Sequence, residues 1–157
     1  MTRSVILGLD ASPKRIGWAV VDYDAGTWIA HGVSTVSGDD DLRARRETFA
    51  SIAQRADRFG DVCAIIIEDA YVGVNRRGTI THAVSVGNVE AWASTRWPDQ
   101  LVVRLAPTTW RKAIGVATVG KAAVMDWAVP QIGRVSQDEA DAFGVAVAGH
   151  RLVWGLT

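Results

Sequence analysis

The sequence predicts an α/β fold in which a mixed five-stranded sheet carries helices on both faces. Two observations lead to this prediction. The chain opens with three short β-like segments joined by turns, which is typical of a meander. Beyond residue 42, segments with helical spacing alternate with two further β-like segments. A meander followed by strand–helix alternation implies a sheet with helices packed on its faces.

The first half of the chain supplies the meander and one helix. Strands are expected over residues 5–10, 16–22 and 27–36. Pro13 marks the first turn, and Asp24-Ala25-Gly26 marks the second. A loop with three successive aspartates, residues 39–41, then leads to a helix over residues 42–59, and Asp41 can cap that helix.

The second half supplies the alternating elements. Residues 63–67 form a continuous apolar run, as expected of a strand buried on both faces. A basic loop over residues 72–78 precedes a helix that Pro98 stops. The remaining elements are expected as a helix over 79–97, a strand over 101–105, a short helix opened by Pro107, a helix from Lys121 that ends before Pro130, and a helix over 137–150.

The bulk composition indicates a single domain over residues 1–157. The apolar runs are too short for a membrane span or a signal-peptide core, so an intracellular, cytoplasmic protein is expected. Cys63 is the single cysteine, which excludes an internal disulfide and favours a buried thiol. The net charge of zero argues against a nucleic-acid partner, unless the basic residues gather on one face.

Four acidic residues stand at the ends of predicted elements. Asp10 and Glu68 each close an apolar strand, and Asp138 and Asp141 are three residues apart on the last helix, so they share one face of it. If the two strands are neighbours and the helix crosses their ends, the four carboxylates converge. Taken singly, each acid has an ordinary explanation as a turn residue, a strand end or a helix cap.

Converging carboxylates repel one another unless cations neutralise them. Hard oxygen ligands favour Mg²⁺ or Mn²⁺ over softer metals. Two such ions can activate a water molecule and stabilise the leaving oxygen in phosphoryl transfer. The acidic residues therefore predict a metal-dependent phosphodiesterase.

Four segments together resemble the RuvC-type Holliday-junction resolvases of the RNase H-like superfamily. They are Leu9 to Val21, Ile66 to Tyr71, Val119 to Val124, and Gln137 to Ala146 with its Asp-x-x-Asp spacing. Their order and spacing extend over nearly the whole chain. One departure lies in the first turn, where Ala11-Ser12 replaces the Pro-Gly that usually follows the first aspartate.

The resemblance implies an RNase H-like fold and a homodimer that nicks two opposed strands of a four-way DNA junction with two Mg²⁺ ions per active site. Mn²⁺ is expected to substitute for Mg²⁺, and a bacterial or phage-infected cell is the expected setting. The implied metal ligands and catalytic acids are Asp10, Glu68, Asp138 and Asp141, with Lys121 as a catalytic cation.

DNA contacts are expected from one aromatic residue and several cations. Tyr71 is a candidate for stacking on an unpaired base, or else packs on the core. Candidate phosphate contacts, each with solvated surface charge as its alternative, are Arg76, Arg77, Arg111, Lys112 and Lys121. Among the seven tryptophans, Trp110 is the one expected to be worth testing for DNA contact.

Small residues at positions 83, 87 and 91 let another surface approach the 79–97 helix closely. That surface is a second subunit or another part of the same chain. His31 and His82 are expected to be structural, and His150 is left open as a group behind the metal ligands.

Three other functions compete with junction cleavage. The first is cleavage of other branched or RNA-containing substrates. The second is a non-catalytic junction-binding module, which would gain nothing from four uncompensated acids. The third is an actin-like ATPase, which needs further glycine-rich loops and a second domain.

Overall fold

The computed structural model describes residues 2–37, 42–71, 75–116 and 120–155. Its centre is a five-stranded sheet of order β3-β2-β1-β4-β5. β1, β2 and β3 form an antiparallel meander, whereas β4 runs parallel to β1 and β5 parallel to β4. The strands are β1 (Ser4–Ala11), β2 (Arg15–Asp22), β3 (Trp28–Thr35), β4 (Asp61–Glu68) and β5 (Leu101–Leu105).

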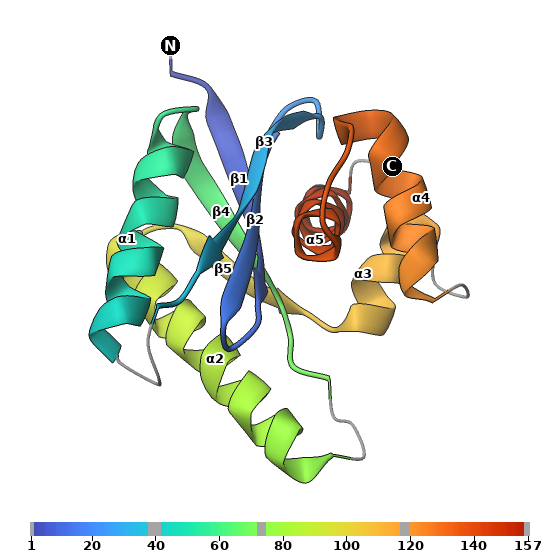
Figure 1. The fold of residues 1–157 in the computed structure, drawn as a ribbon. Coiled ribbons are helices and arrows are strands. Elements are labelled where there is room, and N and C mark those ends of the chain that lie inside the picture. Colours follow the sequence, from blue (N-terminus) through green and yellow to red (C-terminus); the bar gives the residue numbers. More distant parts are fainter. Residues whose placement is uncertain (1, 38–41, 72–74, 117–119, 156–157) are drawn as a thin grey trace.

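Helices cover both faces of this sheet, as Figure 1 shows. One face carries α1 (Leu42–Asp57) and α2 (Arg76–Arg96). The other carries α3 (Pro107–Ile114), α4 (Lys121–Ile132) and α5 (Gln137–Trp154). The predicted α/β fold with a mixed sheet is therefore confirmed. Among the described residues, no helix has both the length and the apolar character that a membrane span requires.

The alternation of side chains along each strand divides the core in two. In β1, Leu7 and Leu9 point to the α1–α2 face, whereas Ile6 points to the α5 face. β4 repeats this pattern, with Ile65 on the first face and Ile66 on the second. The same alternation, continued toward the ends of the two strands, places the side chains of Asp10 in β1 and Glu68 in β4 on the α5 face.

Two glycines let α5 lie unusually close to the sheet. A Cβ atom on Gly8 would stand 2.3 Å from the carbonyl oxygen of Ala142, and one on Gly17 would stand 2.1 Å from that of Asp138. Neither position has room for a side chain. Glycine at these positions therefore brings the first turns of α5 against the ends of β1 and β2.

The turn between β1 and β2 is built on Ser12. Its hydroxyl donates to the carbonyl of Arg15 at 2.5 Å and accepts from the N–H of Arg15 at 3.2 Å. The carbonyl of Ser12 accepts a hydrogen bond from Ser85 on α2, and Arg45 on α1 donates to that same serine. A serine-based turn thus serves where the resolvase pattern has Pro-Gly, and both helices of one face hold it.

Most predicted element bounds agree with the structure within two residues, and three do not. α2 begins at Arg76, three residues before the expected start, because the side chain of Asn75 accepts from the N–H of Gly78 and caps the helix. α5 continues four residues beyond His150, to Trp154. The proposed Asp41 cap and part of the 72–78 loop lie outside the described residues.

The predicted end of the helix before Pro130 is wrong, because α4 continues to Ile132. Proline lacks only one N–H, and Pro130 stands in the last turn, where that loss affects a single hydrogen bond. The side chain of Gln131 also donates to the carbonyl of Trp127 at 2.7 Å. A proline this close to a helix end removes one backbone hydrogen bond without ending the helix.

Candidate metal centre

Three of the predicted acids meet at one end of the sheet. Asp10 is the next-to-last residue of β1, Glu68 ends β4 and Asp141 lies in the second turn of α5. One carboxylate oxygen from each lies within 4.8 Å of the other two, and all three residues are buried. These residues come from distant parts of the sequence, so the fold itself assembles the group.

The strand register explains why the first two acids are adjacent. Leu9 of β1 pairs with Ile67 of β4, so the next residue on each strand, Asp10 and Glu68, follows in register on the α5 face. Asp10 also pairs with Gly17 of β2, the glycine beneath the start of α5. The helix can therefore bring its own carboxylate to the same point.

This arrangement makes the carboxyl group of Asp10 harder to ionise. Burial raises the pKa of its carboxyl well above the ordinary value, and the negative charges of Glu68, Asp141 and Asp138 raise it further. A divalent cation among these oxygens would remove both the repulsion and the penalty for burying charge. Three buried carboxylates are also the hard oxygen donors that Mg²⁺ and Mn²⁺ prefer, so the residues fit such an ion.

Trp110 of α3 orients Glu68. Its indole N–H donates to Oε1 of Glu68 at 3.1 Å, and the tryptophan is fully buried. Gly144 of α5 makes room for the ring, because a Cβ there would lie 2.7 Å from it. Trp110, the tryptophan that the sequence singled out for a test of DNA contact, is enclosed in the core and contacts Glu68. Sequence reasoning missed its actual partner because nothing in the local pattern links the two residues.

Gln137 plays a comparable part for Asp141. Its side-chain amide donates to Oδ1 of Asp141 at 2.9 Å. The two residues are four apart on α5, so helical spacing could have revealed this contact from the sequence.

The start of α5 is fixed to the sheet by a second group of polar contacts. Ser136 and Glu139 form a capping box, and His31 of β3 hydrogen-bonds Glu139 at 2.8 Å. Burial alone would raise the pKa of Glu139, but its hydrogen bonds from Ser136 and His31 lower it below the ordinary value. The expectation of a structural role for His31 agrees with this contact, which ties the edge strand to the helix carrying the acids.

Asp138 differs from the other three acids. Its Oδ2 atom forms an ion pair with a guanidinium nitrogen of Arg15 at 2.7 Å. It is absent from the close group of ligand atoms, although it lines the same cavity and its charge still acts on Asp10. The structure thus separates the four predicted ligands into three convergent carboxylates and one that is paired with a cation.

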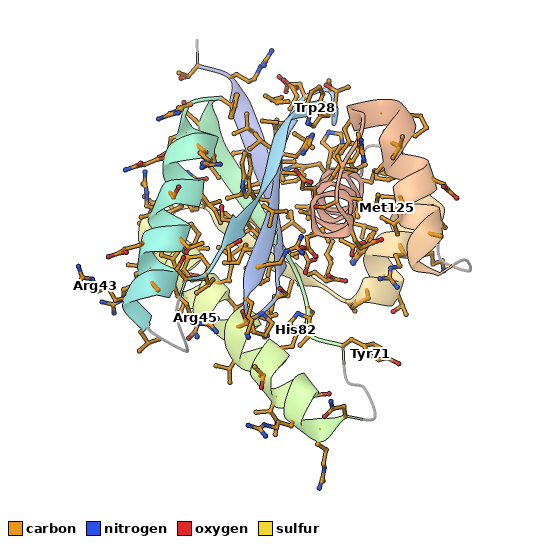
Figure 2. The ribbon with its side chains drawn as sticks, in the orientation of Figure 1. Trp28, Arg43, Arg45, Tyr71, His82 and Met125 are labelled. Atoms are coloured by element: carbon orange, nitrogen blue, oxygen red, sulfur yellow. The ribbon has the colours of Figure 1, made fainter. Side chains whose placement is uncertain are left out.

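A cavity of about 410 Å³ opens over the acids. Tyr71, His82 and Arg111 line it together with the four carboxylates. Figure 2 shows Tyr71 and His82 at the same end of the sheet, opposite Trp28. Tyr71 is 66% exposed, which favours a role at the surface over packing on the core. Arg111 lies over the ring of Trp110, with its charge 5.1 Å from the ring centre.

Three of the other cations predicted to contact DNA, Arg76, Arg77 and Lys112, are not among the residues that line this cavity. Arg76 and Arg77 are exposed in the first turn of α2. Lys112 is exposed and lines a separate hollow with Thr108, Thr109 and Leu152. Lys121 begins α4, but its side chain lies outside the described part of the structure.

Two further residues lie away from the acids. His150 is buried three turns along α5 against Gly26 in the β2–β3 turn, so it does not lie behind the metal ligands. Cys63 is half-buried, and its thiol donates to the carbonyl of Val5 at 3.3 Å, as a packed structural cysteine does.

The sheet order and the two layers of helices give the chain an α/β fold of the RNase H-like type. Solved structures that are similar to it over nearly its whole length include Holliday junction resolvases. RuvC of Thermus thermophilus, solved with a Holliday junction substrate, has a TM-score of 0.74 and 17% identity and matches 97% of this chain and 96% of its own. The resemblance predicted from sequence motifs is thus confirmed for the fold.

The yeast mitochondrial Holliday junction resolvase matches 95% of this chain and 80% of its own, with a TM-score of 0.58 and 11% identity. A hexokinase of the ROK type from Thermus thermophilus has a TM-score of 0.50 and 17% identity and matches 73% of this chain but 40% of its own. No protein-family model matches the sequence, and no curated protein sequence does so either.

Proposed function

We propose that this chain is a structure-selective DNA endonuclease that cuts four-way junctions by Mg²⁺-dependent phosphodiester hydrolysis. The observation that carries the proposal is the convergence of Asp10, Glu68 and Asp141 within 4.8 Å, in a fold shared with Holliday junction resolvases. A protein that only bound DNA would gain nothing from three buried carboxylates beside a polyanion.

Each residue of the centre has a stated part in this proposal. Asp10, Glu68 and Asp141 would hold the first Mg²⁺ ion, and Asp138 would add a ligand for the second. When bound, such ions supply activation of a water molecule and stabilisation of the leaving oxygen. Trp110 and Gln137 keep the carboxylates of Glu68 and Asp141 in fixed orientations through their hydrogen bonds.

The cavity rim would bind the DNA. Tyr71 is exposed enough to stack on an unpaired base at the junction, and Arg111 brings a positive charge into the acidic cavity for a phosphate. Arg76, Arg77, Lys112 and Lys121 remain candidate contacts to the DNA arms. Such an enzyme would serve DNA recombination and repair.

Paired nicks would require a homodimer, and α2 offers a surface for it. Ile80 and Val84 are exposed on this helix, and a Cβ at Gly87 would meet nothing within 4 Å. Together with Ala91 they form one apolar stripe along the helix. The small residues are therefore not needed for close packing inside the subunit, which favours the second-subunit alternative.

Other branched or RNA-containing substrates are the second candidate, because the acidic centre would cut any phosphodiester that the cavity admits. An actin-like ATPase has weaker support, since the hexokinase match extends over less than half of that enzyme.

A cleavage assay tests the proposal. Synthetic four-way junctions, forks, flaps, RNA–DNA hybrids and linear duplex are incubated with Mg²⁺, with Mn²⁺ or with chelator. We expect paired nicks in the junction, weaker cutting of the other substrates and no cutting with chelator. Asp10→Asn and Asp141→Asn should abolish cleavage while the folded chains still bind the junction. Cleavage that survives chelation or either substitution would refute the mechanism, and preferential cutting of a fork, flap or hybrid would support the second candidate.

A further inference from the structure

We infer that Arg15 limits the free protein to one tightly bound divalent cation, by occupying the carboxylate that a second cation would need. This inference rests on the proposed function, because it concerns the same acidic centre. It assigns Arg15 a positioning role: the residue acts through Asp138 and sets how many ions the centre holds.

The geometry divides the acids into two sets. Asp10, Glu68 and Asp141 converge within 4.8 Å of one another. Asp138 stands beside them, and its Oδ2 lies 2.7 Å from a guanidinium nitrogen of Arg15. That oxygen has no solvent exposure and forms no hydrogen bond with any described residue, so Arg15 is the cation that compensates it.

Both partners of the ion pair are held on rigid elements. Arg15 is the first residue of β2. Its backbone carbonyl accepts a hydrogen bond from the hydroxyl of Ser12, and its backbone N–H donates one to that hydroxyl. Asp138 lies in the first turn of α5, directly over Gly17 of β2. The contact is therefore built between the strand and the helix, and it does not depend on a mobile loop.

The charge arrangement makes the pair a competitor for metal. A guanidinium neutralises the carboxylate that would attract a second cation, and its positive charge repels that cation at short range. The Arg15 side chain is 52% exposed, so its guanidinium can leave Asp138 for solvent. The three convergent acids offer a cation three carboxylates whose oxygens lie within 4.8 Å of one another, so their site would fill first.

The alternative is that Arg15 only fastens β2 to α5. Both roles predict some loss of stability when Arg15 is replaced, so stability alone does not separate them. The number of bound cations does, because a purely structural contact would leave it unchanged.

The test is a calorimetric titration of the chelator-treated, full-length protein with Mn²⁺. Wild type should bind one Mn²⁺ tightly. Arg15→Gln should bind a second Mn²⁺ at least about tenfold more tightly than wild type does, the order expected for removing a unit charge within a few ångström of a divalent ion. Arg15→Gln/Asp138→Asn should return to one site, and Lys14→Gln, which removes the neighbouring exposed charge, should behave like wild type.

Circular dichroism and melting curves establish that each variant is folded before titration. Two tight sites in wild type, or an unchanged second site in Arg15→Gln, would overturn the inference and leave the proposed nuclease intact. If wild type binds no Mn²⁺ at all, the proposed metal-dependent function fails with it. As a second readout, the Mn²⁺ concentration for half-maximal junction cleavage should fall in Arg15→Gln, and an unchanged or higher value would contradict the inference.

Discussion

Asp10 carries the electrostatic penalty of the acidic centre. Its pKa is raised in the folded protein, so this group favours folding below its unfolded pKa, and that contribution is lost as pH rises through the folded pKa. At neutral pH the metal-free protein is therefore destabilised by its own centre. We expect Asp10→Asn to raise the melting temperature in chelator at neutral pH, while it abolishes cleavage.

The control for this prediction is the metal-loaded wild type. Added Mg²⁺ should raise the melting temperature of wild type more than that of Asp10→Asn, since the variant has lost a ligand and much of the repulsion. Exposed Asp99→Asn should leave both melting temperatures unchanged. A lower melting temperature for metal-free Asp10→Asn would contradict this account.

Trp110 offers a second prediction at the scale of one residue. Trp110→Phe retains an aromatic ring but removes the N–H that holds Glu68. Losing a partner of this kind behind a metal ligand typically costs about 10- to 100-fold in metal affinity or activity. We expect losses of that size in Mn²⁺ titration and junction cleavage. Trp97→Phe, at another buried tryptophan, should lower stability without changing Mn²⁺ affinity.

Sequence reasoning located the acids but could not rank them. Asp10 and Glu68 were predictable, because an acid that ends an apolar strand is conspicuous. Asp138 and Asp141 share a helix face, and which of them turns inward depends on the rotation of α5 against Gly8 and Gly17. That rotation is a tertiary contact, so the sequence alone does not reveal the pairing of Asp138 with Arg15.

At the scale of elements, the close approach of α5 to the sheet positions the centre. Gly17→Ala would place a methyl group 2.1 Å from the carbonyl oxygen of Asp138, so the helix must move away. Overpacking of this kind costs about 1–3 kcal/mol or more. We expect a lower free energy of unfolding in urea titration and weaker Mn²⁺ binding, because Asp141 moves with the helix.

Gly87→Ala is the matched control, because its Cβ has open space on α2. Alanine is the better helix former by about 1 kcal/mol, so this variant should be as stable as wild type or more so. Equal stability of both variants would show that the spacing between α5 and the sheet does not need glycine.

The strands and most helices were predictable from periodicity, because apolar runs and turns are local signals. The exceptions depended on contacts that periodicity does not register. Asn75 starts α2 early through a side-chain cap, and Gln131 supports the last turn of α4 beside Pro130. Such hydrogen bonds become evident only when side chains are placed.

At the scale of the whole molecule, the proposed metal centre and the proposed dimer surface lie on opposite faces of the sheet. The acids lie on the α5 face. The helix α2, which carries the apolar stripe, lies on the opposite side of the sheet from α5 (Figure 1). Val84→Glu should therefore weaken dimerisation, and the loss of a contact worth about 1.4 kcal/mol raises the dissociation constant tenfold. Sedimentation at micromolar concentrations measures this change, with Mn²⁺ binding expected to stay at the wild-type level.

Val129→Glu, at an exposed valine on α4, is the control and should sediment like wild type. A monomeric wild type, or a Val84→Glu dimer of unchanged affinity, would exclude α2 as the interface.

The mixed sheet and its helical layers were predictable from the order of the elements. The exposure of the apolar stripe on α2 was not predictable in this way, because it depends on which surfaces the rest of the fold leaves unpacked.

The hydrogen bond between Trp110 and Glu68 also makes the protein its own optical probe. An indole whose N–H contacts a carboxyl group experiences a strong local field, and a cation arriving at that group changes the field. The emission of the enclosed ring should therefore shift when the centre fills. Subtracting the spectrum of Trp110→Phe isolates this signal from the six other tryptophans, so metal binding can be followed in real time without a label.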